Sequence, residues 1–413
     1  MTRRRAAGTT ARKEEAAAAA SRILADVRRR GDAAVLRYER RFNSESRGAL
    51  RLSRADVRAA YSRVGAAQMR ALRLAASRLE RTERATMSLL RSRTTSSGGV
   101  RVTRSFEPIR SAGCYVPGGL ARYPSTAVMC VVPARVAGVP RIAVASPPGP
   151  GGEIDPLTVA AADMCGAHEI YRMGGAQAVA ALAYGTESVA AVDKIVGPGG
   201  LVVTEAKRLV SGSTGIDMLA GPTELCIIAD SSADPAHVAL DLASQAEHGG
   251  DSACHLVTDS RRLARAVEEE LRAVVSGSER SAIIRESLRR NGTITTCRTS
   301  EMAAMAESMA PEHLQVMTRD PERTARGITT PGIILLGHGT PSAASDYMLG
   351  TNHVLPTGGT GAFRGSLSVL DFAKLATRAT ASRRAITSAS PHVGALAGAE
   401  GLHAHRAAVE GRL

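Results

Sequence analysis

The chain has 413 residues, enough for two or three domains, and its 44% hydrophobic and 22% charged residues are ordinary for a folded protein. No apolar run reaches the roughly 18–20 residues that span a bilayer, and the basic N-terminus lacks a signal-peptide core, so we expect a cytoplasmic protein without a membrane partner. The net charge of +14 could indicate a nucleic-acid partner, but only 3% of the residues are aromatic and there is no Trp, so an arginine-rich solvated surface without nucleic acid is the expected interpretation.

The N-terminal quarter of the chain is predicted to be a flexible arm over residues 1–14, followed by a mainly helical part over residues 15–110. Alanine, leucine and arginine recur there at helical spacing, and Gly31-Asp32 interrupts the first run. We expect this part to pack with the second of two α/β domains. Its expected elements are helices over 16–30, 33–41 and 53–90, the last with a break inside it, a turn over 96–99 and a strand over 100–106.

Residues 111–222 are predicted to form a first α/β domain. After a glycine-rich loop over residues 111–119, short apolar strands alternate with helices, which indicates right-handed βαβ units and a parallel sheet. The expected strands are 141–145, 169–173 and 194–196, and the expected helices are 156–165, 176–184 and 201–210.

The alternation then restarts, so residues 223–366 are predicted to form a second, similar α/β domain. Residues 367–413 are predicted to be a helical tail that docks on its own domains or on a partner subunit, with helices over 371–381 and 395–410. In the second domain the expected strands are 224–229, 254–258, 292–296, 314–318 and 332–336, and the expected helices are 235–247, 260–274 and 301–309.

The cysteines are widely spaced, and none forms a Cys-x-x-Cys pair. In a chain of this length, such spacing predicts reduced and mostly buried thiols instead of a disulfide framework or a cysteine-type zinc site. The positions are Cys114, Cys130, Cys165, Cys226, Cys254 and Cys297.

Gln245 and His248 lie three residues apart near the end of a predicted helix, so both side chains leave the same face one turn apart. Gly249-Gly250 ends that helix and lets backbone approach whatever the face holds. An imidazole and an amide oxygen can form half of a zinc site. Taken alone, the pattern favours a capping or surface histidine, and only polar clusters elsewhere in the chain give the zinc site weight.

Neither α/β domain has the Gly-x-Gly-x-x-Gly fingerprint of dinucleotide binding after its first strand. The segments 174–177 (Gly-Gly-Ala-Gln) and 197–200 (Gly-Pro-Gly-Gly) each follow a predicted strand, at the edge where open parallel sheets bind ligands. Both could let a dinucleotide come close, although a plain tight turn is the simpler interpretation.

Three further segments carry groups that could complete a site. Glu312 and His313 are adjacent at the start of a predicted strand, where they could exchange protons with a substrate or simply form a surface turn. A long loop over residues 337–359 is rich in glycine and contains a carboxylate and two histidines, and loops of this length are usually functional or disordered. The tail segment 400–405 holds a glutamate and two histidines, which is not a standard metal spacing.

These segments, in this order, resemble the histidinol dehydrogenase family over roughly residues 20–413, and so many ordered motifs make the resemblance very specific. The matching motifs are Tyr-Val-Pro-Gly-Gly with Tyr-Pro-Ser-Thr (115–126), Gly-Gly-Ala-Gln-Ala (174–178), Lys-Ile-Val-Gly-Pro-Gly (194–199), Gln-Ala-Glu-His-Gly (245–249), Pro-Glu-His-Leu (311–314), Asn-His-Val-Leu-Pro-Thr-Gly-Gly (352–359) and Glu-Gly-Leu-x-Ala-His (400–405).

The resemblance implies two incomplete Rossmann-like domains, of which the first binds NAD and the second holds the zinc and substrate site. It implies a homodimer that oxidises L-histidinol to L-histidine through L-histidinal, with two NAD and one zinc ion per subunit. In the family the tail crosses to the other subunit, so the active sites would be shared. The family spacing from Glu400 selects His405 over His403. The zinc ligands would be Gln245, His248, Asp346 and His405, a set that suits zinc.

The resemblance also implies roles for single residues. His313 would be the general base, and Glu312 would activate the water that attacks the aldehyde. Zinc would act as template and Lewis acid. The substrate contacts would be Thr223, Gln245, His248, His313, Asp346, His353, Glu400 and His405, and the cofactor contacts would be Tyr115, Gln177 and the position of Gly200.

Two positions depart from the family pattern. The family usually has Asn where this chain has Gly200, which removes a side-chain hydrogen bond worth about 1 kcal/mol of cofactor binding. It usually has Ser where this chain has Thr223, which keeps the hydroxyl but adds a methyl group. Both departures leave open a zinc- and NAD-dependent dehydrogenase of the same fold that acts on another amino alcohol or hydroxy compound. A nucleic-acid-binding protein would instead show strongly salt-dependent binding and indifference to chelation.

Overall fold

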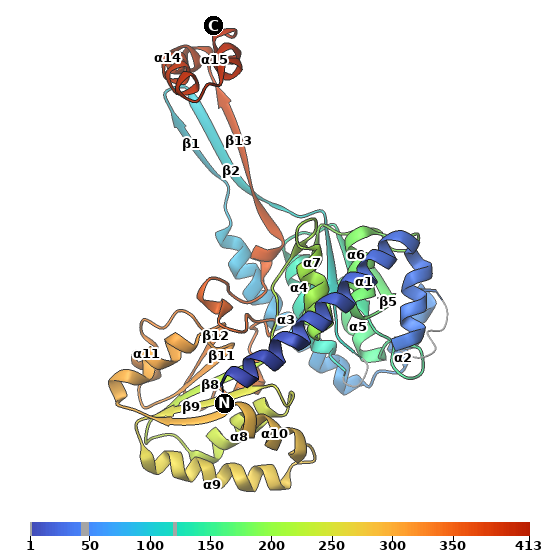
Figure 1. Ribbon diagram of the computed structural model, residues 1–413, viewed down its shortest axis with the longest axis vertical. Helices are drawn as coiled ribbons and strands as arrows, with labels where there is room; N and C mark the ends of the chain where they lie inside the picture. The colour runs from blue at the N-terminus through green and yellow to red at the C-terminus, as the bar shows by residue number, and fades with distance from the viewer. Residues whose placement is uncertain (1, 43–48, 119–121) are drawn as a thin grey trace.

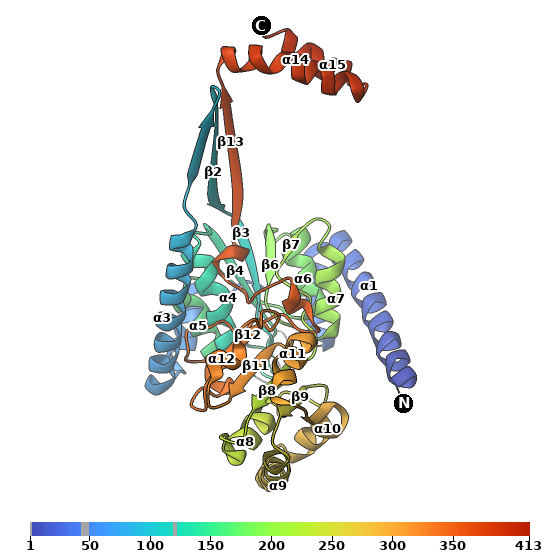
Figure 2. The ribbon, with the colours of Figure 1, turned by 90° about the vertical axis from the view of Figure 1, so that its left-hand side faces the viewer.

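The computed structural model describes residues 2–42, 49–118 and 122–413, with the backbone alone over residues 2–10. Two α/β domains form the body of the molecule, and a three-stranded arm carries the last two helices away from that body (Figure 1). The perpendicular view shows the same projecting arm (Figure 2). Met1 of the predicted flexible arm and residues 119–121 of the 115–126 motif lie outside the described residues.

The first domain contains a sheet of five parallel strands in the order β5-β4-β3-β6-β7. Its central strand occupies residues that were expected to be a glycine-rich loop. The small side chains of this strand let a helix pack closely on it. A Cβ atom at Gly113 would lie only 3.1 Å from the side chain of Leu182 on that helix. The elements are β3 (Ser111–Tyr115), β4 (Arg141–Ser146), β5 (Glu169–Arg172), β6 (Lys194–Val196), β7 (Gly215–Ile216), α4 (Pro124–Val136), α5 (Pro156–Cys165), α6 (Gly175–Tyr184) and α7 (Leu201–Val210).

The second domain repeats this topology with the strand order β10-β9-β8-β11-β12. In both sheets the third strand along the chain lies at one edge and the first lies in the centre, so the prediction of two similar parallel-sheet domains is confirmed. The elements are β8 (Glu224–Ala229), β9 (Ala253–Thr258), β10 (Gly292–Thr296), β11 (His313–Met317), β12 (Ile333–Leu336), α8 (Pro235–Ala246), α9 (Arg261–Gly277), α10 (Ser281–Asn291), α11 (Thr299–Met309), α12 (Pro321–Ala325) and α13 (Ser342–Ser345).

Alternate residues of the central strands face opposite helical layers. In β8, Leu225 and Ile227 belong to one apolar cluster with α8, whereas Cys226 and Ile228 belong to a second cluster with α11. All four side chains are fully buried. Burial of each large apolar side chain contributes about 1.5–3 kcal/mol, so both faces of the sheet hold the domain together.

The N-terminal helices pack on the first domain, which corrects the prediction that they pack with the second. The reason lies in α4, which is apolar and buried on all sides and therefore needs a further helical layer outside it. The helix α1 (Thr2–Phe42) lies against α6 and α7, α2 (Arg54–Ser62) lies against α5, and α3 (Ala66–Leu89) lies against α4.

Residues 2–14, which were predicted to be a flexible arm, are helical, because α1 begins at Thr2. The alanine-rich run that follows has the highest intrinsic helix propensity, and the helix extends through it. Gly31 has non-helical dihedral angles and kinks α1, as its interruption of the helical pattern predicted. Among the helices that the structure describes, none combines the length and apolar composition needed to cross a bilayer.

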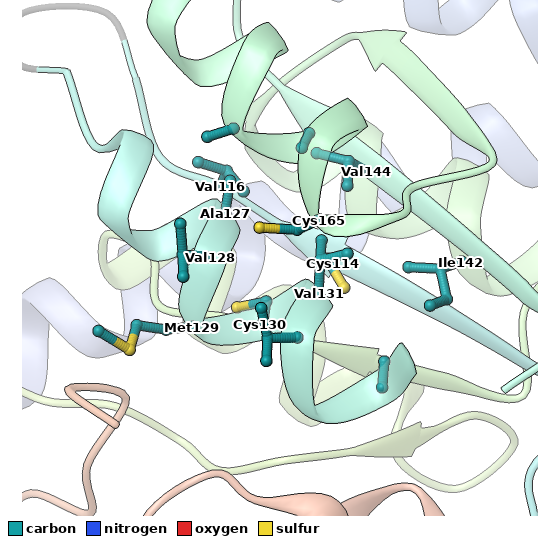
Figure 3. Close-up of a cluster of buried hydrophobic side chains, with 14 of the residues drawn as sticks. Cys114, Val116, Ala127, Val128, Met129, Cys130, Val131, Ile142, Val144 and Cys165 are labelled. Carbon is teal, nitrogen blue, oxygen red and sulfur yellow. The ribbon is translucent and has the colours of Figure 1, made fainter. Parts of the chain in front are cut away.

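Figure 3 shows three cysteines among the apolar side chains of the first domain: Cys114 from β3, Cys130 from α4 and Cys165 from α5. All six cysteines are free, and five of them are buried, which confirms the prediction of mostly buried cysteines. Burial raises the pKa of Cys165 to about 12, so this thiol stays protonated and behaves as an apolar core group.

The arm is an antiparallel sheet in which β2 lies between β1 and β13. The strand β13 corrects the prediction of a helix over residues 371–381, because long-range pairing with β2 along its whole length overrides local propensity. The single helix expected over residues 395–410 is instead two helices, and the first, α14, is capped by Ser382 and begins at Arg383, twelve residues before the expected start. The elements are β1 (Arg93–Ser97), β2 (Val100–Pro108), the 3-10 turns η1 (Thr360–Ala362) and η2 (Val369–Asp371), β13 (Ala373–Ala381), α14 (Arg383–Ala399) and α15 (His403–Glu410).

Glu83, on α3, is a buried carboxyl group that should make stability depend on pH. Removal from water and the nearby charge of Asp371 raise its pKa to about 7 from 4.5, although the N–H of Val369 donates to it over 2.8 Å. Between these two pKa values the folded protein holds a proton that the unfolded chain releases, so stability falls as pH rises from about 4.5 to about 7. The expected loss from this group is about 3 kcal/mol.

Glu83→Gln should remove this part of the pH dependence. Urea unfolding of both proteins at about pH 5 and about pH 8, at one protein concentration, gives the fall in the free energy of unfolding for each protein. The difference between the two falls is the contribution of Glu83. An equal decline in the two proteins would show that Glu83 titrates normally in the folded state.

Candidate active site

Glu312 and His313 lie at the amino end of β11, beside the amino end of β8. Because neighbouring parallel strands begin at the same edge of the sheet, Thr223 and Glu224 reach the same place. The hydroxyl of Thr223 donates to Glu312 Oε2, and the backbone N–H of Glu224 donates to the same oxygen over 2.9 Å. The Glu312 carboxyl group is thus fixed by two donors.

His313 is held between two carboxyl groups. Its Nδ1 lies 3.7 Å from Glu312 Oε2, and its Nε2 lies 3.7 Å from Asp346 Oδ1. The ring is 4% exposed, and within the described part of the chain both buried nitrogens lack a hydrogen-bond partner. Since buried polar atoms normally have partners, this ring is arranged to meet a group that the protein itself does not supply.

The three groups shift one another's proton affinity. Burial would lower the pKa of His313, but Asp346 and Glu312 outweigh it and the net pKa is raised. Burial raises the pKa of Glu312, and His313 and the two hydrogen bonds offset only part of that rise. Burial would also raise the pKa of Asp346, but the three histidines around it, His313, His353 and His248, lower it overall. Asp346 is therefore the carboxylate most suited to face a cation.

The predicted zinc ligands of the second domain lie at this same edge. Gln245 ends α8 and donates its amide nitrogen to Thr223 Oγ1 over 2.6 Å, so its amide oxygen is the atom it can offer to a metal. Asp346 follows α13, which packs on α8, and His248 lies near enough for its charge to act on Asp346. Gln245, His248 and Asp346 therefore lie at the same edge of the second sheet, with His248 exposed to solvent.

His353 connects the site to the first domain. Its Nδ1 lies 2.8 Å from the backbone oxygen of Asp346, and its Nε2 lies 3.2 Å from Thr126 Oγ1 on α4. Removal from solvent lowers the pKa of His353, so the neutral ring is favoured. Thr126 lies inside a quoted motif but was given no role, because its partner is 227 residues away in the chain.

Two predicted site residues do not join this group within one chain. Glu400 follows α14 and His405 lies on α15, both at the far end of the arm (Figures 1 and 2). Within the described ranges no three His, Cys, Asp or Glu side chains gather closely enough to hold a metal. The body of one subunit thus contains three of the four predicted zinc ligands, His248, Asp346 and the amide of Gln245. The fourth, His405, lies at the end of the arm.

The predicted cofactor contacts lie at the carboxyl edge of the first sheet. The hydroxyl of Tyr115 accepts the N–H of Gly175 over 3.0 Å. Gln177 is buried, and its amide nitrogen donates to Glu39 over 2.8 Å. Gly200 caps α7, and a Cβ atom there would meet nothing within 4 Å, so packing does not require glycine at this position.

A buried ion pair that no sequence pattern singled out supports the loop before α7. Lys207 pairs with Asp217, and both are almost completely buried. Lys207 Nζ donates to the backbone oxygen of Gly197 over 2.8 Å, and Asp217 accepts the Gly197 N–H over 2.6 Å. Gly197 itself has a φ of +111°, and a Cβ atom would lie 2.0 Å from the Tyr115 carbonyl oxygen. The one sequence signal was a lysine on an otherwise apolar helix face.

Comparison with known proteins gives consistent matches. The sequence model of the histidinol dehydrogenase family matches residues 6–413. Histidinol dehydrogenase of Cereibacter sphaeroides is 46% identical over 394 residues, which are 95% of this chain and 90% of the relative. That of Methanothermobacter thermautotrophicus is 45% identical over 399 residues, 95% and 92% of the two chains. The crystal structure of histidinol dehydrogenase from Elizabethkingia anophelis superposes with a TM-score of 0.90 at 33% identity, covering 95% and 91%.

Proposed function

This chain belongs to the histidinol dehydrogenase family, an oxidoreductase family of histidine biosynthesis, and from that premise we propose that it oxidises L-histidinol to L-histidine through L-histidinal with two NAD and a zinc ion. The observation that supports this most strongly is His313. It is buried between Glu312 and Asp346, and both ring nitrogens lack a partner in the described residues. A substrate with a hydroxyl and an imidazole would supply the missing groups.

The donor set fits zinc. Gln245, His248 and Asp346 would hold it from one subunit, with His405 from a second subunit, and Asp346 has a lowered pKa that keeps it charged. When bound, zinc would supply Lewis acidity and a fixed anchor for the substrate. Glu400 follows α14 and His405 lies on α15, and the place of these helices at the tip of the arm supports a homodimer with shared sites.

The proton transfers are proposed for the two residues at the start of β11. His313 would take the proton of the substrate hydroxyl in the first oxidation and of the hydrate in the second. Glu312 would take a proton from the water that adds to the aldehyde, and its raised pKa makes it a stronger base than an exposed carboxylate. The nicotinamide ring, when bound, would accept the hydride.

A second candidate is a zinc- and NAD-dependent dehydrogenase of the same fold with a different alcohol. The observation that favours it is the Thr223 hydroxyl, which is engaged by both Glu312 and Gln245. A hydroxyl with two protein partners contributes less to the recognition of an imidazole than the family pattern implies.

NADH formation from L-histidinol, followed at 340 nm, tests the proposal. We expect two NADH per L-histidinol with zinc present and loss of turnover after chelation, restored by added zinc. Absence of turnover in a protein that retains zinc and binds NADH would contradict L-histidinol as the substrate and favour the second candidate. Turnover that is unaffected by chelation would contradict the role of zinc.

A further inference from the structure

Glu39 is a fully buried acid in the last turn of α1, a helix that otherwise covers the first domain. Its Oε1 accepts the backbone N–H of Gly174 and the side-chain amide of Gln177, each over 2.8 Å. These partners lie 135 and 138 residues further along the chain. The contact therefore joins the N-terminal helix to the segment Gly174–Gln177, which is the N-cap and first turn of α6 and carries the predicted cofactor contact Gln177.

The same segment is also held by β3. Tyr115 accepts the N–H of Gly175 over 3.0 Å, so two consecutive backbone amides are fixed by side chains from different elements. Gly174 cannot carry a side chain here, because its Cβ atom would lie 2.4 Å from the Cβ atom of Pro147. Gly175 has a φ of +60°, which side chains disfavour. The segment is thus held in one tightly packed conformation.

Glu39 also decides which way the Gln177 amide points. Because Glu39 accepts the amide nitrogen, the amide oxygen of Gln177 faces Gly175, where it is buried and lacks a partner within the described residues. Without Glu39 the Gly174 N–H and the Gln177 amide would both lose their acceptor, and a buried donor without an acceptor is costly enough to move the segment.

We propose that Glu39 is a positioning residue for the cofactor: it holds the Gly174–Gln177 segment at the start of α6 in the conformation that accepts NAD and presents Gln177 as a hydrogen-bond acceptor. The proposal rests on the proposed function, because Tyr115 and Gln177 are NAD contacts through family resemblance. It assigns a role in cofactor binding to the N-terminal helix, which lies outside both sheets.

The test compares Glu39→Ala, Glu39→Gln and Val35→Ala. Because the chain has no Trp whose fluorescence could report binding, NADH binding is titrated by the fluorescence of NADH itself, without substrate or zinc. We expect Glu39→Ala to raise the Kd for NADH and the KM for NAD about tenfold or more, with kcat and the KM for L-histidinol changed by less than about twofold. Glu39→Gln keeps an acceptor oxygen and should stay within about threefold of the original protein.

Val35→Ala is the control for simple loosening of α1. Val35 is buried on the same helix and belongs to the apolar cluster between α1 and the first domain. Its truncation should lower the Tm without removing a hydrogen-bond acceptor from Gly174 or Gln177. If Val35→Ala weakens NADH as much as Glu39→Ala, or if Glu39→Ala binds NADH normally, the positioning role is wrong. If Glu39→Ala does not fold, Glu39→Asp replaces it, since the shorter acid keeps the charge and withdraws the acceptor, and normal NADH binding would again overturn the proposal.

Failure of the proposed function gives a different result. An original protein that binds NADH but does not oxidise L-histidinol contradicts the substrate and leaves the Glu39 comparison intact. An original protein that binds no NADH and reduces no NAD contradicts the function itself.

Discussion

Replacing Glu312 with Gln is expected to slow oxidation of L-histidinal by about 10²–10⁴-fold and oxidation of L-histidinol much less. The amide keeps the size of the side chain and can still accept from Thr223 and Glu224, but it cannot take a proton from water. Steady-state rates with each substrate supplied separately, together with the yield of NADH per L-histidinol, measure the difference. The yield should fall from two towards one as the aldehyde accumulates.

The matched control is Glu224→Gln. Glu224 is a neighbouring carboxyl group with a pKa that burial raises, and its side chain accepts the backbone N–H of Gly358 over 3.2 Å. We expect this variant to leave the ratio of the two rates unchanged. If Glu312→Gln slows both oxidations equally, Glu312 does not activate the water and instead supports His313.

His405→Asn is expected to lose zinc and to lower activity at least about 100-fold, whereas His403→Asn should change both by little. Both residues are exposed on α15 in the isolated chain, so neither substitution disturbs a core. Zinc per subunit after dialysis, measured by atomic absorption, and NADH formation give two independent readouts. Zinc loss from His403→Asn alone would show that the tail is aligned incorrectly by two residues.

A mixed dimer tests whether the sites are shared. One subunit would carry His405→Asn and the other Glu312→Gln, co-expressed with different tags and purified on both. If the tail completes the partner's site, one of the two sites has both original residues, and the mixed dimer oxidises L-histidinal at about half of the original rate. If each subunit completes its own site, both sites are defective in this step, and the mixed dimer oxidises L-histidinal no faster than the Glu312→Gln protein.

The elements with strong local signals were predicted well. Residues 156–165 were predicted as a helix with the observed bounds, because Asp155 caps its first turn, Pro156 begins it and Gly166 ends it with a positive φ. The strand 224–229 was equally clear, since a buried apolar run in a βαβ context has few alternatives.

The failures involve partners that lie far away in the chain. Residues 373–381 read locally as a helix, and only pairing with β2, more than 260 residues earlier, makes them a strand. The central strand β3 was missed because its small residues are typical of loops, whereas here they allow close packing of Leu182. Neither contact can be predicted from the local composition of the segment.

The same distinction separates the site residues that were predicted from those that were missed. Parallel topology places Thr223, Glu312 and His313 at one edge, and the motif order alone pointed to them. Glu39, Lys207 and Asp217 were missed because each looks like an ordinary charged helix or loop residue until its distant backbone partner is known.

The arm has a consequence for how the enzyme would be made. If its tip completes the site of a second subunit, no subunit can assemble a full metal site while it is alone, whatever its own state of folding. Metal loading would then be a second-order process in subunit concentration and would slow on dilution, as the first association step does. A newly synthesised chain would meanwhile expose Leu396, which is 68% accessible on α14. With metal in excess, subunit encounter would therefore set the rate at which active enzyme accumulates.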